Sequence, residues 1–300
     1  MHTIKSLFLA MGVLALVACG SSNDDNSTST SGSSASNVNA NIPTASMKYI
    51  GDLEFPKVKG GNSIIISHLD GDSLNYSIEW DTEKKSNRWS CYKMYWSNRL
   101  SRTKRYSDSP QYPSDPDMNS SYQYSVDNDP FGKTGYDHGH LCPSADRLNS
   151  ANSNYQTFYL TNMQPQAHSF NDGIWSDMEN LIRSWITVNS SHSDTLYVCK
   201  GGTIDKSTDI FTTTSKGLLV PRYYFSAVLM KNSSGYKAIG FWFDQTVSAS
   251  KQGTLASHVV NIDTLEEKTG IDFFCNLPDD TEEHVESLAV ENILRAWKLN

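Results

Sequence analysis

The sequence lacks the features that would assign it at once to the repeat, membrane-spanning, strongly basic or cysteine-rich proteins. Its 300 residues contain no internal repeat, and the apolar run from Leu7 to Ala18 is too short to span a bilayer. Positive charge is not in excess, because 25 Lys and Arg residues stand against 33 Asp and Glu residues. The resulting net charge of −8, taken as a bulk property, argues against a polyanionic partner. Cysteine is scarce, with five residues, whereas the 38% of hydrophobic residues is enough to build a core.

The first 18 residues are predicted to be an export signal. A basic start with Lys5 precedes the apolar run, and "LVAC" then places small residues before Cys19. This arrangement resembles the lipobox of bacterial lipoproteins, in which Cys19 would be lipidated and become the first residue of the mature chain. It predicts an exported lipoprotein with a membrane anchor, at the outer membrane or cell surface rather than facing the periplasm. The alternative is a cleaved signal peptide with an incidental cysteine.

Residues 19–46 are predicted to be a flexible tether, and residues 47–300 one folded domain. The tether is rich in Ser, Asn, Thr and Gly, so it cannot bury enough apolar surface to offset the entropy of ordering. Four cysteines remain in the domain and permit two disulfides in three pairings, or none. They are Cys91, Cys142, Cys199 and Cys275.

The domain is predicted to have an α+β fold with a largely antiparallel sheet flanked by helices. Helices interspersed among many strands, without regular alternation, favour this class. Short runs of aromatic and β-branched residues, typical of strands, occupy 62–69, 75–82, 89–97, 156–165, 195–202, 222–231 and 236–245.

Three segments are expected to form helices. In 172–186 an apolar stripe recurs at helical spacing. The stripe consists of Ile174, Met178, Leu181 or Ile182, and Trp185. Residues 256–268, followed by Gly270, and residues 281–298 are expected to form the other two.

Two segments carry residue types suited to hydrolysis. In "YDHGHLC", His140 follows Gly139, which is expected to free the backbone and to leave space beside the imidazole. An imidazole with a pKa of about 6.5 can take a proton from water. Asn171 lies where the helix should begin, and Glu179 lies a little over two turns further on. An amide oxygen and a carboxylate suit a hydrated Mg²⁺ ion. A base, such a cation and an arginine are the groups that phosphodiester hydrolysis requires.

The motifs resemble those of the DNA/RNA non-specific endonucleases, the ββα-metal or His-Me finger nucleases. The resemblance covers roughly residues 47–297 and rests on several motifs in the right order and spacing. They are "DHGH" at 137–140, Pro143, "TNMQPQ" at 161–166 and "NDGIWSDME" at 171–179.

The resemblance implies a role for each matching residue. His140 would be the general base, Asn171 the direct protein ligand of Mg²⁺ (or Mn²⁺), and Glu179 the carboxylate that holds its water. Asn162 would support the site, and Arg105, or alternatively Arg102, would contact the scissile phosphate. The resemblance further implies DNA and RNA as substrates and products with 5′-phosphates. The sequence indicates no particular protein partner, inhibitor or oligomeric state.

His138 departs from the family pattern, which has arginine at this position. Histidine lacks the permanent charge and forked donors of arginine, so weaker activity or a preference for lower pH is expected. His138 and Arg147 are assigned to substrate binding, with a surface ion pair as the alternative for Arg147. The net charge does not oppose this, because residues 84–107 contain eight basic and no acidic residues. Phosphate contacts require local charge, and residues 99–105 are expected to supply it.

Two alternatives remain for these residues. His138, His140 and Cys142 alternate, so on a strand they would share a face and could hold Zn²⁺. The second alternative is an exported lipoprotein that keeps a nuclease fold but only binds, as a surface adhesin or as a glycan- or protein-binding module. The combined presence of His140, Asn171 and Glu179 favours the enzyme over the binder.

Overall fold

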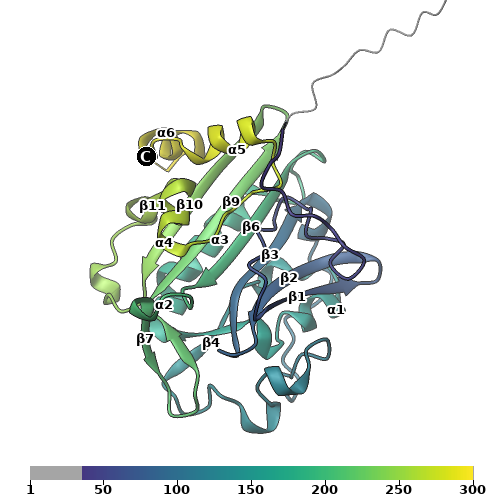
Figure 1. Cartoon of the computed structure of the whole chain (residues 1–300), viewed down its shortest axis with the longest axis vertical. Coiled ribbons are helices and arrows are strands. Elements are labelled where there is room, and N and C mark those ends of the chain that lie inside the picture. Colours follow the sequence, from purple (N-terminus) through teal and green to yellow (C-terminus); the bar gives the residue numbers. More distant parts are fainter. Residues whose placement is uncertain (1–35, 300) are drawn as a thin grey trace, which may run out of the picture. The chain divides into compact units, whose positions relative to one another are not determined.

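The central element is a seven-stranded sheet, seen in a computed structural model that describes residues 36–299 (Figure 1). The order is β1-β2-β3-β6-β9-β10-β11, and every neighbouring pair is antiparallel. The strands are β1 (Ser63–Asp70), β2 (Ser73–Asp81), β3 (Ser86–Tyr95), β6 (Thr195–Gly202), β9 (Tyr223–Asn232), β10 (Gly235–Asp244) and β11 (Val259–Val260).

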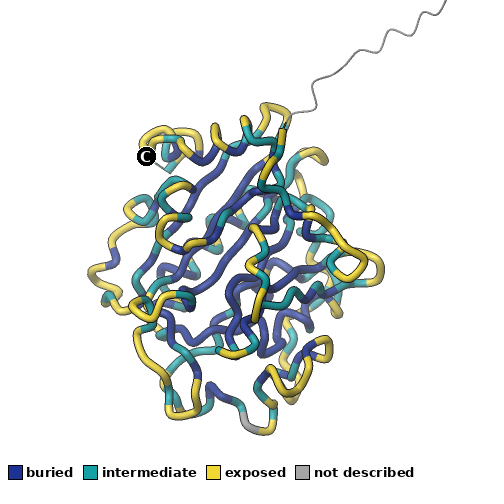
Figure 2. Tube along the Cα trace, viewed as in Figure 1, coloured by how far each residue is buried: buried dark blue, intermediate teal, exposed yellow. Residues whose placement is uncertain are grey.

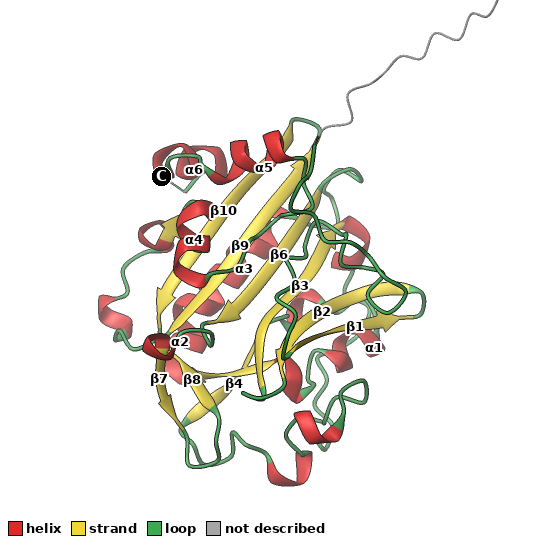
Figure 3. Ribbon diagram, viewed as in Figure 1, coloured by secondary structure: helices red, strands yellow, loops and turns green. Residues whose placement is uncertain are grey.

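Helices cover both faces of this sheet (Figure 3). The α-helices are α1 (Ala151–Gln156), α2 (His168–Phe170), α3 (Ser176–Trp185), α4 (Ile262–Thr269), α5 (Asp279–Glu286) and α6 (Val290–Trp297). A π-helical turn, η6 (Asn171–Trp175), joins α2 to α3. Short 3₁₀ turns are η1 (Trp96–Arg99), η2 (Ser120–Tyr122), η3 (Val126–Asn128), η4 (Ser144–Asp146), η5 (Leu160–Asn162), η7 (Ser207–Asp209), η8 (Ala249–Lys251) and η9 (Leu255–His258).

The two sides of the sheet belong to two separate hydrophobic cores. Because strand side chains alternate, Tyr92 of β3 packs into one core with α3 and α6, and its neighbour Cys91 packs into the other with α4 and α5. Figure 2 shows the central strands buried along most of their length. Burial on both faces explains why β9, with its sequence YYFSAVLM, is almost continuously apolar.

A smaller unit of two strands and a helix lies beside the main sheet. Strand β4 (Tyr136–His140) pairs antiparallel with β5 (Met163–Ala167), and the chain continues directly into α2, η6 and α3. A third sheet pairs β7 (Ile210–Thr213) with β8 (Leu219–Pro221). The predicted α+β class, with its antiparallel sheet, flanking helices and ββα unit, is therefore confirmed.

Three predicted elements were wrong in part. In the helix expected over 256–268, only the part from residue 262 is α4, because the residues before it form the end of η9 and strand β11. Of the strand expected over 156–165, only the end is β5, because the preceding residues form the end of α1 and η5. The helix expected over 281–298 is two helices, α5 and α6. Val285 of α5 packs into the core on one face and Ile293 of α6 into the core on the other, so the chain must turn between them.

The predicted tether is shorter than the sequence suggests. Residues 36–41 are fixed to the domain: Asn37 donates to the carbonyls of Cys275 and Leu277, and Asn41 is 8% exposed. Residues 36–41 therefore belong to the folded part, which the sequence had placed from residue 47 onward. The predicted signal (1–18), the lipidation site Cys19 and residues 19–35 lie outside the described residues. Between residues 36 and 299, no helix has the length and apolar character needed to cross a bilayer.

Candidate active site

The residues predicted from the motifs meet in one cavity of about 450 Å³. Strand β4 forms one wall, and the segment from α2 to α3 forms another. The residues that line it are Arg105, Tyr112, Tyr136, Asp137, His138, His140, Pro143, Ser144, Ala145, His168, Asn171, Asp172, Ser176 and Glu179.

His140 ends β4 with one ring nitrogen held and the other available. Its Nδ1 lies 3.3 Å from the His138 carbonyl oxygen, so Nδ1 carries the proton and Nε2 is the acceptor. Nε2 is buried and has no hydrogen-bond partner among the described residues. Burial, followed by the nearby Arg105 charge, lowers the pKa of His140 to about 3. The imidazole is therefore neutral and its free lone pair can accept a proton.

Asn162 fixes the chain just after His140. The side chain is fully buried and makes four hydrogen bonds: Oδ1 accepts from Cys142 N and Ser90 Oγ, and Nδ2 donates to the carbonyls of Cys142 and Thr157. It does not line the cavity. Asn162 therefore positions the His140 strand and is not itself a catalytic group.

Gly139 has a packing reason rather than the predicted one. A β-carbon at this position would overlap the side chain of Gln166 on the paired strand β5. The glycine thus lets β5 approach β4 closely, instead of leaving space beside the imidazole.

Asn171 is oriented by Asp137. Its Nδ2 donates to Asp137 Oδ2 over 3.0 Å, which turns its Oδ1 the other way and leaves that oxygen free to bind a cation. The same Asp137 oxygen also lies 2.8 Å from His168 Nδ1, and this contact raises the pKa of His168. Asn171 is the first residue of the π-helical turn η6, which contains the non-helical Gly173. Such turns often occur at functional sites.

Glu179 is partly buried, with 13% of its side chain exposed, and is paired with Lys200. The Nζ of Lys200 lies 2.8 Å from Glu179 Oε1, and Arg183 lies 3.9 Å from Oε2. Burial raises the pKa of Glu179, although Lys200 acts in the opposite direction. Sequence reasoning missed Lys200. The signal was a lysine within the apolar strand segment "TLYVCKGG", because a charged side chain in a buried strand requires a partner.

The structure separates the two candidate phosphate-binding arginines. Arg105 lines the cavity of His140, and its guanidinium lies 4.8 Å from the centre of the Phe158 ring. Arg102 instead lines a second cavity, with Asp70 and Ser150. Arg105 is therefore the arginine positioned to meet a phosphate beside His140.

His138 lines the same cavity as His140 and is held by three side chains. Its ring stacks on Tyr112, with centroids 3.6 Å apart, and on Phe131 at 4.4 Å. Its Nε2 lies 3.1 Å from Asp129. Burial lowers the pKa of His138 although Asp129 opposes this, so the ring is a neutral packing group at the cavity wall.

Arg147 does not reach the cavity, so its assignment to substrate binding is corrected. It is only 2% exposed, and its guanidinium donates to the carbonyls of Asn75, Lys93 and Asp146. It also packs over the ring of Tyr92. Three backbone acceptors and an aromatic face satisfy the guanidinium internally. It is neither a surface ion pair nor a phosphate contact.

Only some of the basic residues in 84–107 are available to a ligand. Arg88 is buried between Glu79 and Asp205, and Lys93 pairs with Asp52. Arg102, Lys104 and Arg105 are exposed. The end of the stretch, and not its whole length, therefore supplies the charge near the cavity.

The Zn²⁺ alternative is not supported. His138 faces Asp129, and Cys142 is buried with its pKa raised to about 12 by burial. Two other sets of three metal-ligating side chains converge within residues 36–299, namely His68 with Asp115 and Asp117, and Asp263 with Glu266 and Glu286. All four cysteines of the described domain are free, so no disulfide forms there.

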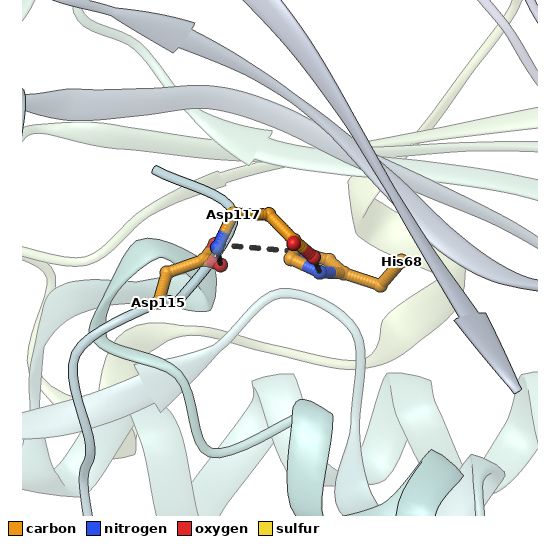
Figure 4. Close-up of side chains that lie close together, drawn as sticks. All are labelled: His68, Asp115 and Asp117. Carbon is orange, nitrogen blue, oxygen red and sulfur yellow. Dashed lines mark hydrogen bonds and ion pairs between the residues drawn. The ribbon is translucent and has the colours of Figure 1, made fainter. Parts of the chain in front are cut away.

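The first of these sets is an ionic cluster behind the site (Figure 4). The buried His68 lies between Asp115, 3.2 Å from Nε2, and Asp117, 3.4 Å from Nδ1. Burial alone would lower the pKa of His68, but the two carboxylates outweigh it and raise it. Both ring nitrogens lie within ion-pair distance of a carboxylate, and these two negative charges favour a protonated His68 over a metal ligand. Asp115 also accepts from Thr161 Oγ1, next to Asn162.

Comparison with known proteins gives one consistent result. A family model described as DNA/RNA non-specific endonuclease matches residues 67–280. The chain is similar to a nuclease of Nostoc sp., at 29% identity over 167 residues that cover 52% of this chain and 57% of the relative. It is also similar to the mitochondrial nuclease EXOG of Xenopus laevis, at 25% identity over 224 residues that cover 69% and 58%. The chain thus spans little more than half the length of these two relatives.

The fold has a solved counterpart. The crystal structure of the EndoG/EndoGI complex, described as the mechanism of EndoG inhibition, aligns with a TM-score of 0.60 and 18% identity. The alignment covers 78% of this chain and 94% of that chain. At this identity the likeness concerns the arrangement of strands and helices.

Proposed function

Since the chain belongs to the DNA/RNA non-specific endonuclease family, we propose that it hydrolyses phosphodiester bonds of DNA and RNA in a metal-dependent reaction. The proposed cleavage has little sequence specificity and leaves products with 5′-phosphates. The observation that carries it is the free, buried Nε2 of His140 in a cavity shared with Arg105, Asn171 and Glu179.

The residues of the cavity fit a magnesium ion. Asn171 presents an amide oxygen that Asp137 leaves free, and Glu179 presents a carboxylate on the next turns of the same helical segment. Oxygen donors of this kind are those that Mg²⁺ and Mn²⁺ prefer. Asn171 would hold the ion directly, and Glu179, whose Oε1 is already bound by Lys200, would bind through its hydration shell. When bound, the ion would neutralise charge that develops on the phosphate and leaving oxygen.

His140 acts as the general base in this proposal. Its Nε2 takes a proton from the attacking water, and the His138 carbonyl keeps Nδ1–H in place. Arg105 binds the phosphate by charge. A bound phosphodiester adds a negative charge next to His140 and so offsets the effect of Arg105 on its pKa. The base therefore holds the proton better when the substrate is present.

The location of the protein is also a proposal. The signal-like residues 1–18 and Cys19 support an exported lipoprotein at the outer membrane or cell surface. Metabolic labelling with a radioactive fatty acid would test it, because the wild type but not Cys19→Ser should carry the label.

Digestion of supercoiled plasmid and of RNA tests the reaction. The wild type should cut both with Mg²⁺, and EDTA should abolish cleavage. His140→Ala should lower the rate by about a thousandfold or more, as expected for loss of a general base, while a fluorescence-anisotropy assay should still detect substrate binding. Binding without cleavage by the wild type in Mg²⁺ or Mn²⁺ would instead favour the exported binding module.

A further inference from the structure

Another cavity, separate from those of His140 and Arg102, lies against α4 and α5 on the face of the main sheet opposite α3. It measures about 440 Å³ and shares no residue with the cavity of His140. The residues that line it are Val38, Asn39, Glu266, Asp272, Asp279, Glu282, Glu283 and Glu286. Six of these eight carry a carboxylate, and Asp263 on α4 lies beside them.

These carboxylates have no cationic partner. None of the ion pairs within the described domain includes them. Burial first, and then neighbouring carboxylates, raise the pKa of Glu266 to about 8 and of Glu286 to about 10. The ammonium group of Lys57, whose charge acts on Asp272, donates to the carbonyls of Asn39 and Ala40 instead.

Glu286 supplies an observation beyond the acidic composition. The residue is only 6% exposed, it lines the cavity, and its Oε1 is buried without a hydrogen-bond partner in the described chain. An unpartnered buried carboxylate oxygen is costly unless a bound group satisfies it. The Oδ1 of Asn39, on the opposite wall, is likewise buried and unpartnered.

We propose that Asp263, Glu266 and Glu286 bind one calcium ion. One ligand oxygen from each of the three lies within 4.8 Å of the others. Three oxygens this close together can bind one calcium ion, for which Ca–O distances are about 2.4 Å. The donors are all carboxylate oxygens, which calcium prefers, whereas zinc is bound mainly by nitrogen and sulfur and magnesium usually keeps several of its waters.

The calcium ion would join α4 to α5 at a cavity that the N-terminal segment, residues 36–41, helps to form. Asn39 Nδ2 donates to Glu282 over 2.9 Å and to Asp272 over 3.2 Å, so the segment already forms one wall of the cavity. Asp279 also accepts from Ser36 Oγ and from Val38 N. Figure 1 shows this purple segment beside the yellow chain that leads into α5. The ion would replace the protons on the carboxyls of α4 and α5, next to the wall that the segment forms.

Thermal unfolding of the full-length chain tests the site. Asn171→Ala serves as the background, because it removes the ligand proposed for the catalytic cavity. In this background, Ca²⁺ at a hundredfold excess over its Kd should raise Tm by about 5 °C or more relative to EGTA. Equal Mg²⁺ should not reproduce the shift, and calorimetric titration should give one Ca²⁺ per chain.

Glu286→Gln and Glu266→Gln should each abolish most of the Ca²⁺ shift. In EGTA near pH 7 both variants should be about as stable as their parent, because the raised pKa values leave both carboxyls protonated without the ion and glutamine has nearly the same shape. Glu291→Gln, an exposed carboxylate of α6, is the matched control and should keep the full shift. A shift that persists in both site variants, or no Ca²⁺ response in the parent, would overturn the proposal. If the parent shows no Ca²⁺ response, protons alone neutralise the three carboxyls. Mg²⁺-dependent cleavage by Glu286→Gln should equal that of the wild type, so the two proposals fail separately.

Discussion

Lys200 Nζ donates to Glu179 Oε1 over 2.8 Å, and the lysine side chain is fully buried. The pair joins the middle of the main sheet, through β6, to the helix α3 that follows the ββα strands. The carboxylate that is proposed to serve the metal is therefore held from behind by a lysine that does not line the cavity.

Lys200→Met should lower both stability and activity. Loss of the lysine leaves the partly buried Glu179 without a close partner, which should cost about 3–5 kcal/mol of unfolding free energy. The pKa of Glu179 should rise further, so the acid limb of the pH–rate profile should move to higher pH. Guanidinium unfolding and cleavage rates at several pH values would measure this. Lys231→Met, an exposed lysine of β9, is the control, and a Lys200→Met profile identical to that of the wild type would contradict the role.

Arg105→Ala and Arg102→Ala should differ sharply. Arg105 shares the cavity of His140, so its loss should reduce kcat/KM by about a hundredfold, as for other groups that stabilise charge in a transition state. Arg102 lines the other cavity and its loss should change kcat/KM little. Steady-state cleavage of a fluorescent oligonucleotide would compare them. Equal losses in the two variants would show that the loop acts through its overall charge.

Asn162→Ala should unfold more easily and cleave more slowly. Four hydrogen bonds disappear and leave buried groups such as Cys142 N–H unsatisfied, at a cost of about 3 kcal/mol or more. Urea unfolding would measure the stability, with exposed Asn292→Ala as the control. If Asn162 only positions His140, activity should fall without a change in the metal concentration needed for half-maximal rate.

His140 should make the protein less stable in acid. Its folded pKa of about 3 lies below the unfolded value of about 6.5, so the unfolded state binds more protons between these values. In EDTA, unfolding free energy should therefore fall as pH drops from about 6.5 to 3, with this residue contributing up to about 1.4 kcal/mol per pH unit. His140→Gln should flatten the slope in urea unfolding at a series of pH values. An unaltered slope would mean that the imidazole is protonated in the folded protein.

His138→Arg should raise activity or broaden its pH range. The histidine is neutral and packed against Tyr112 and Phe131, whereas arginine would bring a permanent charge beside Asp129 at the cavity wall. The pH–rate profile of the variant would measure the effect. If it coincides with that of the wild type, position 138 serves packing alone.

Much of this site could be predicted because its residues lie in short local motifs. His140 and Asn171 belong to the strand and to the helix start of one ββα unit, so sequence spacing determines where they meet. Lys200 could not be found in this way, since it reaches Glu179 from a strand of the other sheet. Arg147 was misassigned because its acceptors are backbone carbonyls from three segments, which leave no trace in residue type.

The strands were predicted more accurately than the helices for a similar reason. Alternation and aromatic content indicate where a strand lies even without knowledge of its neighbours. The break between α5 and α6 depends instead on which face of the sheet each helix covers, and this is a property of the assembled domain.

The free cysteines offer a measure of how this domain opens. Cys91 and Cys199 lie opposite each other on β3 and β6, and both are fully buried at the centre of the main sheet. A thiol reagent can reach them only when those strands separate. Their labelling rate would therefore report the unfolding rate of the sheet directly, without an introduced probe.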